Sequence, residues 1–228
     1  MTLLLFDIDG TLVRINGTGR RAIERSLSSL TERPISTEEI SFSGRTDPDI
    51  FEAILAKNDL APTKAAIATA IDSYVETMQG ALTTADVELL PGVRSLLSHL
   101  HTHPTVQLGL VTGNVEPIAL KKLSVHDLAQ YFPVGAFGSD HRDRNQLPDL
   151  ATRRASAHAG VSFRPETQAI VIGDTPHDIE CARAVGARVM AVCTGRHGRS
   201  ELSSHAPDFL HDTLPAADFF LKQLGIER

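Results

Sequence analysis

The segment LLLFDIDGTL near the start of the chain, residues 3–12, constrains the fold more than any other segment. Its four consecutive apolar residues, 3–6, predict a strand that is buried on both faces, as strands inside a parallel sheet are. Such a strand places Asp7 and Asp9 at its carboxyl end, where open α/β sheets form their ligand crevice. Gly10 allows the backbone to turn sharply or to approach an anion closely. An ordinary Asp-Gly turn, capped by Asp9, is the alternative interpretation.

A second predicted strand also ends in polar residues. Residues 106–111 lead directly into Thr112, Gly113 and Asn114. A hydroxyl and free backbone N–H groups at a strand end suit a phosphate oxygen. A plain strand-to-helix turn, with Asn114 as the helix cap, explains this segment equally well by itself.

A third predicted strand, residues 169–172, leads to Asp174, and Asp178 follows one turn into the next helix. Asp178 alone could be a simple partner of the helix dipole. Four carboxylates at two strand ends, however, repel one another unless a cation or a shared proton compensates. Ligation by oxygen atoms suits Mg²⁺, which binds one or two carboxylates together with a substrate phosphate. The pattern therefore predicts a Mg²⁺ site.

The loop before the third strand, residues 141–148, is basic. It contains Arg142 and Arg144 and ends at Pro148, which is typical of a helix start. Arginine is always protonated, and its planar group suits phosphate oxygens, so one of the two could neutralise a phosphate. A solvated charged loop is the commoner outcome for such a run.

In this order, the segments DIDGT, TGN, the basic loop and GDTPHD resemble the pattern of the haloacid dehalogenase-like hydrolase superfamily. The resemblance runs from Leu3 to the strand near Val192, and within the superfamily it is greatest to phosphatases of the phosphoglycolate phosphatase-like group. One departure concerns the basic residue, which is usually a lysine in the family, whereas the corresponding stretch here holds only arginines. We favour Arg144 over Arg142 because it lies nearer the helix start at Pro148.

The resemblance also implies a role for each motif. Asp7 is expected to be the nucleophile and Asp9 the general acid and base. Mg²⁺ is expected to bind Asp7, the main-chain carbonyl of Asp9, and Asp174, with Asp178 close behind. The expected phosphate and substrate contacts are Gly10, Thr112, Gly113, Asn114 and Arg144.

The remaining pattern predicts an α/β fold with an inserted helical region. After residue 93, predicted helices and strands alternate, which indicates a Rossmann-like parallel sheet with helices on both faces. Between the first two strands, residues 19–30, 50–57 and 64–78 are predicted as helices, without a strand pattern between them. We therefore expect a catalytic core of residues 1–13 and 89–228, and a helical cap domain of residues 14–88.

Composition limits the classes of partner. The net charge of −6 in a chain of 228 residues argues against a nucleic-acid surface. No apolar stretch approaches membrane-spanning length, and no signal segment precedes the first strand, so we expect a cytoplasmic protein without membrane contact. Cys181 and Cys193 have no metal-binding or redox spacing and are expected to be free thiols. The basic loop at residues 196–199 is expected to be a solvated turn, and its position at a strand end leaves a minor substrate role as the alternative.

These features together predict a Mg²⁺-dependent phosphatase that acts on a small phosphorylated metabolite through an aspartyl-phosphate. In the predicted cap, Arg45 could meet an anionic substrate; alternatively it pairs with Asp47, which caps its own helix. A phosphotransferase of the β-phosphoglucomutase type would share every catalytic motif. A non-catalytic module that binds a phosphorylated metabolite is the other alternative, although binding alone needs no pair such as Asp7 and Asp9.

Overall fold

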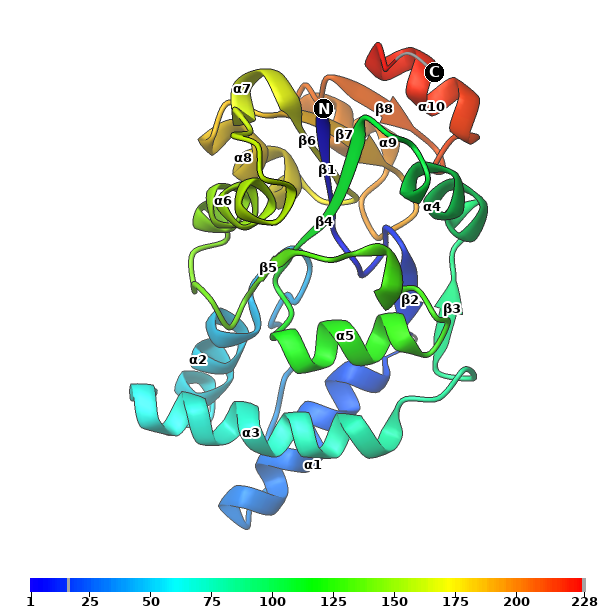
Figure 1. Ribbon diagram of the computed structural model, residues 1–228. Coiled ribbons are helices and arrows are strands. Elements are labelled where there is room, and N and C mark those ends of the chain that lie inside the picture. The colour runs from blue at the N-terminus through cyan, green and yellow to red at the C-terminus, as the bar shows by residue number, and fades with distance from the viewer. Residues whose placement is uncertain (16, 227–228) are drawn as a thin grey trace.

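A computed structural model of the protein describes residues 1–15 and 17–226. Its main sheet contains six parallel strands in the order β5-β4-β1-β6-β7-β8 (Figure 1). The predicted α/β fold with a parallel sheet is confirmed. The strands of this sheet are β1 (Thr2–Phe6), β4 (Val106–Thr112), β5 (Gly135–Phe137), β6 (Ala169–Gly173), β7 (Arg188–Val192) and β8 (Phe209–His211).

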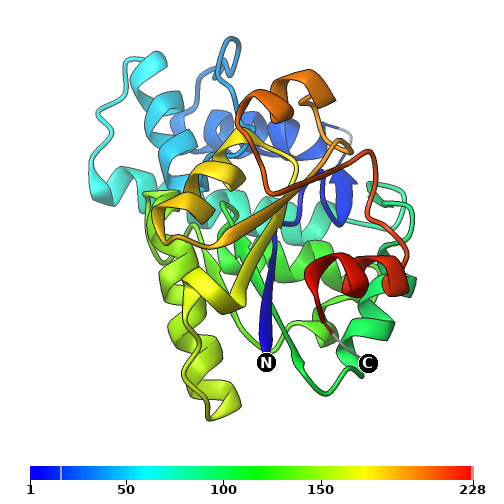
Figure 2. The same ribbon diagram turned by 90° about the horizontal axis from the view of Figure 1, so that it is seen from above.

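Side chains that alternate along β1 divide the core into two layers. Leu4 and Phe6 belong to one buried cluster, and Leu3 and Leu5 belong to the other. Figure 2 shows this strand (blue, marked N) between α6 (yellow-green) on one side and α10 (red) on the other. The helices that follow the insert are α4 (Val93–His101), α5 (Glu116–Ser124), α6 (Leu147–Ala159), α7 (Pro165–Gln168), α8 (Pro176–Ala184), α9 (Arg199–Ser204) and α10 (Ala217–Leu224), with short 3₁₀ turns η1 (Ala129–Tyr131) and η2 (Arg144–Gln146).

In the described residues, three helices lie between β1 and α4 in the sequence, and they gather at the end of the sheet where β1 terminates (Figure 1). They are α1 (Thr18–Thr31), α2 (Asp47–Lys57) and α3 (Lys64–Ala81), each close to its predicted range. We call residues 17–86 the helical insert. Helix α3 packs against α1, α2 and α5, so that α5 lies between the insert and the sheet.

Two features of the fold differ from the prediction. Short strands β2 (Val13–Ile15) and β3 (Val87–Leu89) pair in antiparallel fashion on either side of the insert. Three residues are too few to give an alternating pattern that can be recognised in the sequence. The segment expected to be a basic turn is irregular at residues 196–198, but its last residue, Arg199, begins α9 and forms an ion pair with Asp212.

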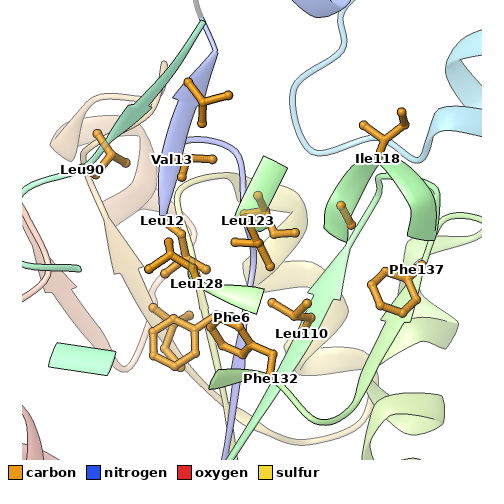
Figure 3. Close-up of a cluster of buried hydrophobic side chains, with 14 of the residues drawn as sticks. Phe6, Leu12, Val13, Leu90, Leu110, Ile118, Leu123, Leu128, Phe132 and Phe137 are labelled. Carbon is orange, nitrogen blue, oxygen red and sulfur yellow. The ribbon is translucent and has the colours of Figure 1, made fainter. Parts of the chain in front are cut away.

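A hydrophobic cluster fixes α5 on the sheet. Figure 3 shows Phe6 and Leu110 from the strands beneath Ile118 and Leu123 from α5, with Phe132 and Phe137 nearby. Ile118 and Leu123 are fully buried. Burying such side chains stabilises the folded state by roughly 1.5–3 kcal/mol each, so the polar groups at the start of α5 are held on a rigid base.

Candidate active site

Three carboxylates predicted at the strand ends come together. Asp7 follows β1, Asp174 follows β6, and Asp178 lies in the first turn of α8. Because β1 and β6 are neighbours in the sheet, their carboxyl ends meet at one edge. The three buried side chains can each offer one oxygen within 4.8 Å of the others. A Cβ at Gly10, whose φ is +83°, would lie 2.4 Å from Asp174 Oδ2, so this close approach requires glycine.

The buried carboxylates are hard to ionise in this arrangement. Burial raises the pKa of Asp7 to about 7; the Arg144 cation lowers it, and the negative charges of Asp178 and Asp9 raise it further. Burial, followed by Asp178 and Asp7, raises the pKa of Asp174 well above its ordinary value. Both effects disfavour negative charge, so the cluster is suited to a bound cation.

Arg144 is the arginine that reaches these carboxylates. Its Nη2 donates to Asp178 Oδ1 at 2.5 Å and lies 3.1 Å from Asp7 Oδ1. Burial alone would lower the Arg144 pKa, but Asp178 and Asp7 raise it well above its usual range. Its buried Nε has no hydrogen-bond partner in the described part of the chain. The site therefore contains a permanent cation with an N–H group to spare.

The Arg142 side chain pairs with the helical insert instead of with these carboxylates. This side chain is 54% exposed and pairs with Asp49 and Glu52 of helix α2. The structure thus brings Arg144 into the site and leaves Arg142 as a link between the loop before α6 and the helical insert.

The polar residues after β4 lie beside Asp9. Asn114 Nδ2 donates to Asp9 Oδ2 at 2.7 Å and to Thr112 Oγ1 at 2.9 Å. Thr112 is fully buried at the end of its strand. Gly113 is in close contact with the insert, since a Cβ there would lie only 2.0 Å from the Arg45 carbonyl oxygen. Thr112, Gly113 and Asn114 line the same cavity as Asp9.

Lys122 is a site residue that the sequence analysis missed. From α5, its Nζ donates to Asp9 Oδ2 at 2.6 Å and to Asn114 Oδ1 at 2.6 Å. A signal existed, because the helical period places a lysine on the same face as the apolar Ile118 and Ala119. A lysine on a buried face needs acceptors close by.

Arg45 lies on the loop that enters α2, and it pairs with Asp49 rather than with Asp47. Its Nε donates to Asp49 Oδ2 at 2.6 Å. The alternative interpretation of this segment, in which Arg45 pairs with Asp47 and Asp47 caps its own helix, is wrong. Asp47 Oδ2 instead accepts the Val115 backbone N–H at 2.8 Å, at the start of α5. Burial raises the Asp47 pKa to about 6, although the Lys122 cation and the Val115 N–H lower it.

A cavity of about 370 Å³ opens over these groups, between the sheet and the insert. The core contributes charged and polar residues, including Asp7, Asp9, Lys122 and Arg144. The insert contributes apolar side chains, which are Ile23, Phe42, Ile50 and Tyr74, together with Arg20, Ser43, Arg45 and Asp47.

The loop after β7 belongs to this region in part, which agrees with the alternative interpretation of that loop. Arg196 lines the cavity, and His197 Nε2 lies 2.9 Å from Ser43 Oγ in the insert. Both cysteines are free; Cys181 is buried and Cys193 half-buried. In the described residues, no helix combines the length and the apolar character needed to span a membrane.

Comparisons with known proteins agree with this geometry. The family model described as haloacid dehalogenase-like hydrolase matches residues 4–192. The chain is 29% identical to phosphoglycolate phosphatase 1 of Pseudomonas aeruginosa, covering 95% of this chain and 79% of that protein. It is also 29% identical to a phosphoglycolate phosphatase of Cereibacter sphaeroides, covering 93% and 95% of the two chains.

A solved structure supports the fold independently. The crystal structure of CbbY from Rhodobacter sphaeroides in complex with phosphate superimposes with a TM-score of 0.71 at 22% identity, covering 99% of this chain and 100% of that one. The family match covers the helical insert and the site residues from Asp7 to Asp178. This chain therefore belongs to the haloacid dehalogenase-like hydrolase family.

Proposed function

We propose that this phosphatase hydrolyses small phosphate monoesters of the phosphoglycolate type, with Mg²⁺ and through an aspartyl-phosphate on Asp7. The observation that carries the proposal is the convergence of Asp7, Asp174 and Asp178 within 4.8 Å, beside Arg144 and beneath a cavity. Relatives named phosphoglycolate phosphatase support the substrate class.

The donor set fits Mg²⁺. Three carboxylates converge in a buried place where burial and mutual repulsion disfavour their charge. Asp7, Asp174 and Asp178 would hold the ion, together with the main-chain carbonyl of Asp9 that the family pattern adds. When bound, Mg²⁺ supplies positive charge that attracts a phosphate oxygen and keeps the carboxylates ionised.

The residues divide the reaction between them. An Asp7 carboxylate oxygen bonds to phosphorus while the bond between phosphorus and the leaving oxygen breaks. Asp9 donates a proton to the leaving oxygen. Water then attacks the phosphorus of the aspartyl-phosphate, Asp9 accepts its proton, and inorganic phosphate leaves with Asp7 restored.

The other site residues hold the phosphoryl group. Arg144, with its spare Nε–H, neutralises charge on the phosphoryl oxygens. Thr112 and the Gly113 N–H hold the same oxygens, while Gly10 keeps the nucleophile loop close to Asp174. Asn114 orients Asp9.

We further propose that residues 14–88 form a cap domain over a catalytic core of residues 1–13 and 89–228. The cap would exclude water and select the leaving group, with Arg45 facing an anionic part of the substrate. Because Arg45 also pairs with Asp49, its guanidinium is held at the cavity rather than free in solvent. The cytoplasm remains the proposed location.

A phosphate-release screen over phosphorylated metabolites tests the function. We expect release from phosphoglycolate or another small monoester, dependent on Mg²⁺ and abolished by EDTA and by Asp7→Asn. Hexose phosphates are included with product analysis, because return of the phosphoryl group to a sugar would identify a phosphotransferase. Saturable ligand binding without any turnover would contradict the proposal.

A further inference from the structure

Lys122 is a buried cation in the site that the proposed reaction does not yet use. Its side chain is only 6% exposed, and its ammonium group donates to Asp9 Oδ2 and Asn114 Oδ1, both at 2.6 Å. Asn114 also donates to Asp9 Oδ2, at 2.7 Å. Lysine, asparagine and aspartate thus form a closed triangle of hydrogen bonds at the edge of the cavity.

A lysine in this place is unfavourable unless it has a specific partner. Removing an ammonium group from water is costly, and only nearby acceptors offset that loss. An apolar side chain would fill the same position on α5, beside Ile118 and Ala119, without any such penalty. The ammonium group is therefore best explained by what it does to Asp9.

Both donors bind one oxygen of Asp9. Lys122 and Asn114 each donate to Oδ2, and in the described part of the chain Oδ1 has no hydrogen bond. The Asp9 side chain is 41% exposed, so without these two bonds it would be free to change rotamer at the cavity wall. With them, a single oxygen remains available to a ligand.

We propose that Lys122 is a positioning residue for Asp9: together with Asn114 it fixes Oδ2, so that Oδ1 is presented to the reacting oxygen. This inference rests on the proposed function, in which Asp9 transfers protons. Oδ1 gives its proton to the leaving oxygen as the bond from that oxygen to phosphorus breaks. It later takes a proton from the water whose oxygen bonds to phosphorus. Lys122 itself does not touch the phosphoryl group, which is neutralised by Arg144 beside Asp7.

A double-mutant cycle tests the proposal. We measure kcat and KM with an alkyl phosphate substrate in wild type, Lys122→Met, Asp9→Asn and the double variant. Lys122→Met should lower kcat by roughly 10- to 100-fold, the range for a lost hydrogen bond between charged groups, with little change in KM. In the Asp9→Asn background the same substitution should change kcat by no more than about two-fold, because the group that Lys122 positions is already disabled.

A burst experiment adds a measurement that distinguishes a positioning role of Lys122 from a merely structural one. With p-nitrophenyl phosphate, whose leaving group needs no proton, the nitrophenolate burst should keep its rate in Lys122→Met. Steady-state turnover should fall, because hydrolysis of the aspartyl-phosphate still needs a positioned base. Lys121→Met is the matched control, since Lys121 is the preceding residue of the same helix and has no role in the site. It should behave like wild type.

The possible results distinguish a failure of this inference from a failure of the proposed function. If Asp9→Asn is fully active, the proposed role of Asp9 fails and the inference with it. If Asp9→Asn is impaired but Lys122→Met is not, only the inference fails. It is also overturned if the two substitutions have additive effects, or if Lys122→Met raises KM alone, which would make Lys122 a substrate contact. Circular dichroism and thermal unfolding check folding, and Lys122→Gln carries the same cycle if the methionine variant does not fold.

Discussion

At the scale of single residues, Asp7 and Asp9 stand one residue apart in very different surroundings. Asp7 is 5% exposed and lies among carboxylates and Arg144, whereas the Asp9 side chain is 41% exposed and is held by Lys122 and Asn114. A nucleophile benefits from a site that excludes water, and a group that exchanges protons must reach the leaving oxygen and then the water. The difference in environment matches the difference in proposed role.

Asp9→Asn should distinguish these roles. Loss of general acid catalysis is expected to slow formation of the phosphoenzyme from an alkyl phosphate by roughly 10²–10⁴-fold. Formation from p-nitrophenyl phosphate should be slowed far less, because nitrophenolate leaves without a proton. Rapid-quench measurement of the phosphoenzyme gives both rates. Equal slowing with the two substrates would contradict the general-acid role.

The two arginines before α6 should respond differently to substitution. Arg144→Ala should lower kcat/KM by roughly 10- to 100-fold, because it removes a buried charged donor from the phosphoryl group. Arg144→Lys should restore part of that loss, since it keeps the charge. Arg142→Ala should matter much less, because its exposed side chain pairs with Asp49 and Glu52 of α2.

Steady-state kinetics on the three variants, with thermal unfolding to verify folding, gives the comparison. An inactive Arg142→Ala beside an active Arg144→Ala would reverse the assignment. Two active alanine variants would show that other residues neutralise the charge of the phosphate.

The sequence predicted the residues at strand ends and missed Lys122, which lies within helix α5. Asp7, Asp9 and Asp174 follow continuous apolar runs, and parallel strands carry their ends to the same edge. Lys122 lies 113 residues from Asp9 in the chain, so no local pattern connects them. Only the packing of α5 through Ile118 and Leu123 makes them neighbours.

At the scale of elements, the N-terminus of α2 is hydrogen-bonded directly to the N-terminus of α5. The Asp47 backbone N–H donates to the Gly113 carbonyl at 2.7 Å, and its carboxylate accepts the Val115 N–H at 2.8 Å. A carboxylate at the N-terminus of α5 satisfies a donor there and complements the helix dipole. The alternative interpretation of the sequence placed this residue as the cap of its own helix, because capping patterns are local, whereas here it caps a helix from another segment.

Asp47→Asn should change how stability depends on pH. Burial raises the Asp47 pKa from 3.8 to about 6 in the folded state. A raised folded-state pKa gives stability that is present below pH 4 and is lost as the pH rises through 6. Relative to the asparagine variant, wild type should therefore lose up to roughly 3 kcal/mol of unfolding free energy between pH 4 and pH 7. Urea unfolding of both proteins across this range provides the measurement, and parallel curves would contradict the prediction.

At the scale of the whole molecule, the insert is tied to the core at several points around the cavity. Arg142 pairs with Asp49 and Glu52, His197 meets Ser43, and Arg144 Nη1 donates to the Gly44 carbonyl at 3.2 Å. The sequence predicted a helical region after the first strand from its 3.6-residue period. The sequence could not predict these contacts between the insert and the core, because each contact joins segments whose positions depend on the packing of the whole chain.

Mg²⁺ should stabilise the folded molecule independently of activity. A ligand at one hundred times its Kd adds about 2.7 kcal/mol, and in a chain of this size each kcal/mol shifts Tm by about 2–4 °C. Saturating Mg²⁺ should thus raise the Tm of wild type by roughly 5–10 °C and that of Asp174→Asn by much less. Sodium chloride at equal ionic strength is the control. An equal rise in both proteins would place the ion outside the Asp7, Asp174 and Asp178 cluster.

The most direct measurement identifies the residue that carries the phosphoryl group. Asp9→Asn is mixed with p-nitrophenyl phosphate and Mg²⁺, quenched in acid, reduced with borohydride and analysed by peptide mass spectrometry. Borohydride converts an aspartyl-phosphate to homoserine, so residue 7 should show the mass of homoserine, and Asp7→Asn treated in the same way should show no such change. Reduction at any other aspartate, or no reduction in a protein that still releases phosphate, would contradict Asp7 as the nucleophile.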